Sequence, residues 1–276
     1  MALYSNTMAV IRQYLSSSVG DLIYGQAGVT GATTTKIYAP FLWKADDYYN
    51  DLYYEVYVYA GTNIGVTKRV TDWVLFTYLL TVHSAYAAAC DATSYVELHH
   101  KFTTDEYEKA INQAIEFLAD KYLLDIVDVA IPLATGIYEY AMPTSTAFEY
   151  VHRVTLETIA AGSIFANANI INPDFYDFIL VGALSYIKLD EVKYPIVAAD
   201  NGKDLRIEGQ KRQPLLTANT SICYLPLDFI VNKAITYLPQ GKIESLQMQA
   251  TVARAAAFAA DVPMKGTYPE SKRVLL

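Results

Sequence analysis

The sequence predicts an α+β protein in which a helical bundle of about four helices carries antiparallel modules of β-sandwich or barrel-like form. Two observations favour this fold class. Segments with the apolar spacing of amphipathic helices lie far apart in the chain, and long stretches rich in Tyr, Val, Ile and Thr separate them. In addition, 24 of the 276 residues are tyrosine, whose rigid apolar ring and hydrated hydroxyl suit both pleated sheets and subunit interfaces.

Residues 1–34 are predicted to form an N-terminal helix followed by a loop. Ser5 or Asn6 is placed to cap the helix, and the serines at 16–18 with Gly20 are placed to end it. A loop rich in Gly and Thr comes next. The apolar residues that share one face of this helix are Met8, Ile11, Tyr14 and Leu15.

Residues 35–102 are predicted to form the first β module. Its strands are expected at 52–60, 72–83 and 93–100. In the first strand Tyr53, Tyr57 and Tyr59 share one face, because alternate residues of a strand point to the same side. Apolar residues occupy the opposite face, so both faces are expected to be covered, and the three tyrosines are candidate interaction residues.

The strongest local signal begins a central helix, residues 103–125. Thr103 and Glu106 have the spacing of a capping box, in which each side chain accepts a hydrogen bond from the backbone N–H of the other residue. Phe102 and Tyr107 are placed for the hydrophobic staple that accompanies such a cap. The role of this motif is structural, because it starts a helix with one apolar face.

A second β module is predicted over residues 126–224, and C-terminal helices over 225–262 are predicted to complete the bundle. The strands of the module are expected at 136–142, 149–158, 175–187 and 203–209. Pro226 opens the first of these helices, since Pro is favoured at the first helical position. An alanine-rich face of the next helix would let another helix approach closely. That face consists of Ile243, Leu246, Ala250, Ala253, Ala257 and Ala260.

Residues 263–276 have neither a helical nor a strand period and are predicted to form an extended arm. The arm carries apolar residues at its tip, and either the surface of its own subunit or that of a neighbour is expected to order it. Its candidate interaction residues are Tyr268, Lys272, Arg273, Val274, Leu275 and Leu276.

The motifs of common enzymes are missing, so no catalytic, cofactor-binding or metal-binding residue is predicted. The chain contains no Gly-x-Ser-x-Gly motif and no glycine-rich phosphate loop. His99 and His100, with Glu97 and Asp105 nearby, are a possible metal site. Adjacent residues of a strand point to opposite faces, however, which favours ordinary strand histidines.

An acidic and aromatic segment offers an alternative of a different class. Asp46, Asp47 and Asp51 lie among tyrosines, as in the lining of a carbohydrate cleft, where carboxylates act as acid and base and rings stack on sugars. A solvated acidic turn is favoured instead, because no second carboxylate cluster supports the pair.

Charge and composition favour protein partners over nucleic acid or membrane. The net charge of -8 argues against a surface that neutralises many phosphates, and Lys211 and Arg212 beside Arg206 suit a contact with an acidic neighbour better than DNA. Only 18% of residues are charged while 53% are hydrophobic, so some apolar surface is expected to meet a partner. Cys90 and Cys223 are expected to be small buried hydrophobes. The chain shows no secretion signal and no apolar stretch of membrane-spanning length.

The order of several segments resembles the head-tail adaptor (connector or neck) proteins of tailed phages, over most of the chain. The most specific stretch is Thr103-Thr-Asp-Glu-Tyr-Glu-Lys-Ala-Ile-Asn-Gln-Ala-Ile115. The other matching stretches are Gly65-Val-Thr-Lys-Arg-Val-Thr-Asp-Trp73, Tyr95-Val-Glu-Leu98, Tyr140-Ala-Met-Pro143, Asp204-Leu-Arg-Ile-Glu-Gly209, Leu225-Pro226 and Tyr268-Pro-Glu-Ser-Lys-Arg-Val274.

This resemblance implies a non-enzymatic structural protein of the virion, made in the host cytoplasm and located in the neck. It implies a ring homo-oligomer, typically twelvefold, that binds the portal protein and a downstream neck or tail protein. DNA would pass through the ring without specific binding. A tail terminator or another tail component, usually sixfold, is the nearest alternative, and a carbohydrate-binding β module is a more distant one.

Overall fold

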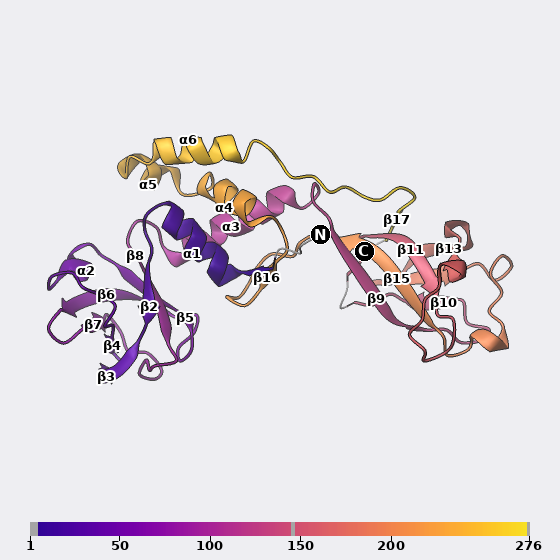
Figure 1. Cartoon of the computed structure of the whole chain (residues 1–276), viewed down its shortest axis with the longest axis horizontal. Helices are drawn as coiled ribbons and strands as arrows, with labels where there is room; N and C mark the ends of the chain where they lie inside the picture. Colours follow the sequence, from indigo (N-terminus) through magenta and orange to yellow (C-terminus); the bar gives the residue numbers. More distant parts are fainter. Residues whose placement is uncertain (1–4, 145–146, 275–276) are drawn as a thin grey trace. The chain divides into compact units, whose positions relative to one another are not determined.

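A computed structural model of the chain describes residues 5–144 and 147–274. The chain divides into two compact units (Figure 1). Unit 1 takes in the described residues up to Leu118 together with Pro214–Pro263, and unit 2 takes in Ala119–Gln213 together with the described residues from Met264. Unit 1 is therefore built from two stretches of chain that are separated in sequence by most of unit 2.

The chain is mostly β-sheet, so the predicted fold class, a helical bundle that carries β modules, is wrong. The described residues form antiparallel sheets of seven, five, three and two strands, whereas the longest helix has only 15 residues. The helices are α1 (Met8–Ser18), α2 (Tyr48–Asp51), α3 (Thr104–Leu118), α4 (Leu227–Ile235), α5 (Gln240–Ser245) and α6 (Gln249–Phe258). Segments rich in Tyr, Val and Thr form the sheets.

The large sheet of unit 1 has the strand order β2-β8-β5-β6-β7-β4-β3. Strands β2 and β3 follow one another along the chain, separated only by Ala27, yet they lie at opposite ends of this order, so the sheet curls back on itself. Its enclosed core includes Trp73, Val56 and Val58, which are fully buried. The strands are β2 (Ile23–Gln26), β3 (Gly28–Thr33), β4 (Lys36–Tyr38), β5 (Glu55–Ala60), β6 (Thr67–Val74), β7 (Leu79–Val82) and β8 (Tyr95–His99).

Helices α1, α3 and α4 pack against one another in unit 1, and α6 packs on α4 (Figure 1). The predicted capping box of α3 is confirmed, because the N–H of Thr103 donates to Glu106 Oε2 at 2.8 Å and the N–H of Glu106 donates to Thr103 Oγ1 at 3.2 Å. The cap of α1 is Thr7 and neither Ser5 nor Asn6. A two-stranded sheet, β1 (Asn6–Thr7) with β16 (Ile222–Cys223), ties the start of α1 to the segment before α4.

The predicted alanine face fails because the C-terminal helix is broken. The helix stops after α5 and restarts at α6, with Gln247 between them in the left-handed region at a φ of 55°. This break changes the phase of the helix, so Ala255 and Ala259 are buried while Ala253 and Ala257 are exposed. Two predicted strands are hairpins in the structure. The range 72–83 contains the end of β6 and all of β7, and the range 175–187 contains β13 and most of β14.

Unit 2 contains two antiparallel sheets around one core. Val154 and Ile207 from the five-stranded sheet are buried with Tyr176 and Ile187 from the three-stranded sheet. The first sheet has the order β12-β11-β15-β9, with β17 also paired to β11: β9 (Leu124–Pro132), β11 (Tyr150–Leu156), β12 (Ile170–Ile171), β15 (Asp204–Lys211) and β17 (Lys272–Arg273). The second has the order β10-β14-β13: β10 (Glu139–Ala141), β13 (Tyr176–Val181) and β14 (Leu184–Leu189).

Candidate interaction surfaces

The three tyrosines predicted to share a strand face have different surroundings. Tyr57 is 6% exposed, and the guanidinium of Arg12 lies 4.4 Å from its ring centroid. Tyr53 precedes β5 with a φ of 57° and is 69% exposed. Tyr59 is half-buried and lies next to Tyr95, with the two ring centroids 6.0 Å apart. Only Tyr53 and Tyr59 therefore keep accessible ring surface, and a contact with a neighbour stays a prediction for both.

Tyr59 belongs to a tyrosine face, which we define as Tyr24, Tyr59 and Tyr95 on the adjacent strands β2, β5 and β8. Tyr24 and Tyr95 are exposed, and they lie near each other because Gln26, two residues after Tyr24, pairs with Tyr95. Burial raises the pKa of the Tyr59 hydroxyl, although its hydrogen bond with Gln13 of α1 acts in the opposite direction. The face thus combines apolar ring area with hydroxyls, a composition common in protein interfaces.

Three exposed aromatic residues, which we call the aromatic tip, are Trp43, Phe76 and Tyr78 on two loops joined by hydrogen bonds. Trp43 is 71% exposed and Phe76 is 93% exposed, the highest exposure among the large apolar side chains of the described residues. Tyr78 has a φ of 55° in the turn between β6 and β7. Large aromatic side chains this exposed are typical of sites that bind another molecule.

Backbone and side-chain hydrogen bonds hold the two loops of the aromatic tip together. The indole N–H of Trp73 donates to the carbonyl of Lys44 at 2.9 Å, and the N–H of Leu75 donates to Asp46 Oδ1 at 2.7 Å. The ammonium of Lys44 lies 4.0 Å from the ring centroid of Trp43. The exposed rings are therefore presented on loops that the buried Trp73 fixes in place, a preorganisation that lowers the entropy lost on binding.

The acidic and aromatic segment considered as a carbohydrate cleft has a different construction. Asp46 accepts the N–H of Leu75, and Asp47 accepts the side-chain amide of Asn50 at 3.1 Å. Tyr49 and Tyr54 are buried in the core of unit 1. These two rings have no free face on which a sugar could stack.

A buried ionic network lies beneath α1. Arg12, which is fully buried, donates from Nε to Glu97 Oε2 at 2.8 Å and from Nη1 to Glu108 Oε1 at 2.7 Å, and Nη1 also donates to Asn219 Oδ1 at 2.9 Å. Burial tends to raise the pKa of Glu97, but its hydrogen bond with His99 and the charge of Arg12 outweigh burial and lower it. The network joins α1, β8 and α3, with Arg12 and Glu97 fully buried and Glu108 35% exposed at its edge.

Asp21 is the centre of a second buried cluster in unit 1. Its carboxylate accepts the backbone N–H groups of His100, Lys101 and Phe102 at 2.9, 2.9 and 3.1 Å, and the hydroxyl of Tyr107 at 2.8 Å. Burial acts to raise the pKa of Asp21, but the hydrogen bonds from the His100 ring and these N–H groups outweigh it and hold the pKa below its ordinary value. Asp21 thereby fixes the turn that leads into α3.

The two adjacent histidines have separate carboxylate partners. His99 is buried and approaches Glu97 Oε2 at 3.3 Å, whereas the ring of His100 contacts Asp21 at 2.9 Å. Within residues 5–144 and 147–274, no three His, Cys, Asp or Glu side chains are grouped so as to hold a metal ion. Over the same residues, no helix has the length and apolar character to cross a membrane.

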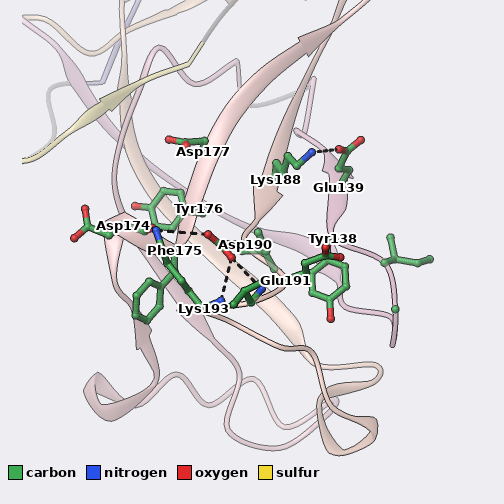
Figure 2. Close-up of a pocket in the computed structure, with 14 residues that line it drawn as sticks. Tyr138, Glu139, Asp174, Phe175, Tyr176, Asp177, Lys188, Asp190, Glu191 and Lys193 are labelled. Atoms are coloured by element: carbon green, nitrogen blue, oxygen red, sulfur yellow. Dashed lines mark hydrogen bonds and ion pairs between the residues drawn. The ribbon is translucent and has the colours of Figure 1, made fainter.

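A hollow of unit 2, with a volume of about 700 Å³, is acidic (Figure 2). Lys188 pairs with Glu139 at 2.7 Å, and Asp190 Oδ1 accepts the backbone N–H of Lys193 at 3.0 Å. Aromatic rings contribute to its wall. Its charged lining residues are Glu139, Asp174, Asp177, Asp190, Glu191, Lys188 and Lys193. Five carboxylates against two ammonium groups make this hollow unfavourable for phosphate.

A cluster of charges lies on the outer face of the five-stranded sheet of unit 2. Glu208 is 5% exposed and pairs with both Arg153 and Arg206. Burial lowers the pKa of His152, which lies beside Glu208. Arg212, from the basic pair Lys211 and Arg212, also pairs with acidic residues of its own chain. It contacts Asp120 at 2.6 Å and Glu149 at 3.1 Å.

The C-terminal arm, residues 264–274 of the structure, is bound to unit 2 of its own chain. Tyr268 packs on the ring of His152, with centroids 4.5 Å apart. Lys272 pairs with Asp177 at 2.8 Å, Arg273 is exposed, and Val274 is 3% exposed within the core of unit 2. The predicted residues Leu275 and Leu276 lie outside the described residues.

Comparison of the chain with protein-family models and with curated proteins gave no match.

Two buried residues with several polar contacts each, Arg12 and Asp21, were not predicted from the sequence. Arg12 stands on the apolar face of α1 between Ile11 and Leu15, and a charge in an apolar stripe is a signal of a buried ionic partner. Asp21 gave no such signal, because the groups it binds lie about 80 residues further along the chain.

Proposed function

We propose that this protein is a structural subunit of a tailed-phage virion that forms a ring between the portal and the tail and continues the DNA channel. The observation that carries the proposal is the aromatic tip, in which Trp43 and Phe76 are exposed on loops fixed by hydrogen bonds. Preorganised exposed aromatic residues are typical of the energetic centres of protein interfaces. The resemblance of residues 103–115 to adaptor proteins is the reason for proposing a ring between the portal and the tail as the assembly.

A ring built by rotation requires two different surfaces on each subunit, one for each neighbour. Unit 1 presents two candidates, the aromatic tip and the tyrosine face. The charge of the chain is compatible with a channel through which DNA passes without being held, because a net charge of -8 and the acidic hollow of unit 2 both disfavour contact with phosphates.

The first test is to image the native assembly, count copies around its axis and locate them relative to the portal. A twelvefold ring in contact with the portal supports the adaptor function. A sixfold ring assigns the protein to the tail, and an isolated monomer rejects the proposal.

The second test measures self-association of Trp43→Ser and Phe76→Ser variants by mass photometry over a range of concentrations. Each truncation is expected to remove about 2 kcal/mol of association free energy, or about 30-fold in the association constant. Val192→Ser is the matched control, because Val192 is an 83% exposed apolar residue in a turn of unit 2. Equal association of all three variants contradicts a role for the aromatic tip.

A further inference from the structure

The C-terminal arm makes a discrete set of contacts with unit 2. The N–H of Lys265 donates to the carbonyl of Lys121 at 2.8 Å, and the N–H of Leu123 donates to the carbonyl of Lys265 at 2.9 Å. The Lys265 ammonium also pairs with Asp125 at 2.6 Å. This end of the arm is thus fixed by both backbone and charge.

The other end of the arm adds a strand to the five-stranded sheet. In β17, Arg273 pairs with Tyr150 and Lys272 pairs with Val151 of β11. The N–H of Val274 donates to the carbonyl of Glu149 at 2.8 Å, and its side chain enters the core. The binding site for the arm therefore consists of a strand edge, an apolar pocket and two carboxylates, none of which depends on which chain supplies the arm.

The connection between α6 and the arm, residues 259–263, is short, and its middle is exposed. Asp261 is exposed, and Met264 is 77% exposed. Pro263 disfavours helical geometry at Val262 and pushes that residue toward an extended conformation. A short, stiff linker between a unit and its docking strand is the arrangement in which an identical strand from a second copy takes the place of the first.

We propose that in the assembled ring the arm is exchanged, so that β17 of one copy pairs with β11 of the neighbouring copy. This inference rests on the proposed ring. Exchange preserves every hydrogen bond and ion pair of the arm, so its free-energy change is mainly the entropy of association. Adjacency in a ring reduces that entropy, because a tethered partner has an effective concentration of about millimolar.

A disulfide cross-link between paired positions distinguishes an exchanged arm from an unexchanged one. Paired residues of antiparallel strands have Cα atoms about 4.5–5.5 Å apart, within the range that a disulfide spans. Chains carrying only Tyr150→Cys are mixed with chains carrying only Arg273→Cys, assembled, oxidised and run on a non-reducing gel. In an equal mixture about half of the Arg273→Cys chains are expected to meet a Tyr150→Cys neighbour and form a covalent dimer.

Each variant assembled alone is the control, and the native Cys90 and Cys223 are both buried and stay out of the reaction. Mass photometry under reducing conditions verifies that the variants assemble as the wild type does. The exchange is overturned, and the ring is not, if the mixture forms a ring without covalent dimers while a chain carrying both Tyr150→Cys and Arg273→Cys forms a disulfide within one monomer. A chain that forms no ring overturns both proposals.

Discussion

Replacing Asp21 by asparagine tests the account of the cluster that holds the turn before α3. The substitution keeps the size of the side chain and one acceptor oxygen, so Oδ1 continues to serve the N–H groups of His100 and Lys101. In the wild type, Oδ2 accepts hydrogen bonds from the N–H of Phe102 and the hydroxyl of Tyr107. The substitution replaces Oδ2 by an amide nitrogen, which donates hydrogen bonds and accepts none. The hydroxyl can rotate to accept a hydrogen bond, but the backbone N–H cannot.

The expected loss follows from these contacts. An orphaned buried N–H costs about 1–3 kcal/mol, and the change from charged to neutral acceptor weakens the hydrogen bonds that remain by a further amount of about 1 kcal/mol. We therefore expect Asp21→Asn to lower the unfolding free energy of unit 1 by about 3 kcal/mol. For a unit of this size that corresponds to a fall in Tm of about 6–12 °C.

The pH dependence provides an independent check. The pKa of Asp21 is lower in the folded chain than in the unfolded chain, so its stabilisation is complete above the unfolded value of about 3.9 and is lost as the pH falls through the folded value. Urea titrations at pH 7 and at pH 3 are expected to show a smaller difference between wild type and variant at the lower pH. Asp261→Asn, at an exposed site, is the control. A variant within 0.5 kcal/mol of wild type, on the scale of ordinary surface substitutions, refutes the reasoning.

Three further substitutions test other parts of the fold by thermal or urea denaturation. Thr103→Ala removes one half of the capping box and is expected to cost about 1 kcal/mol, and no loss would mean that the cap is dispensable. Gly209→Ala is expected to cost more than about 2 kcal/mol, because its Cβ would overlap the carbonyl oxygen of Tyr150. The control is Gly266→Ala, where a Cβ meets nothing within 4 Å. Equal stability of the two variants contradicts this steric explanation. Val274→Ala is expected to cost about 1–3 kcal/mol by leaving a cavity in unit 2, whereas an arm that contributes nothing to the fold would give no change.

The sequence predicted features whose determinants are local. The capping box of α3 was found because its two residues lie three positions apart and satisfy each other. Buried cysteines were likewise expected, and Cys90 and Cys223 are both buried. The covering of both faces of β5 followed from alternation alone, since Val56 and Val58 point into the core while Tyr57 lies under Arg12.

Features that depend on tertiary packing were not predicted. The apolar period of a helix continues through residues 246–248, so the local sequence did not indicate the break between α5 and α6. The turn between β13 and β14 was hidden in a continuous apolar run, Leu180-Val-Gly-Ala-Leu184, whose glycine at 182 adopts a φ of 64°. The exposure of Trp43 and Phe76 was also missed, because apolar residues in a β-rich segment are expected in the core.

The discontinuity of unit 1 sets the order in which the chain can fold during synthesis. The apolar sides of α1 and α3 leave the ribosome early, but α4, which buries Phe229, Ile230 and Ala234, emerges only after residues 119–213 have been translated. At the usual rate of translation this interval lasts on the order of 5–20 s. The apolar sides of α1 and α3 therefore stay uncovered by α4 while this stretch of unit 2 is synthesised. A chaperone that binds apolar surfaces can bind the nascent chain during this interval.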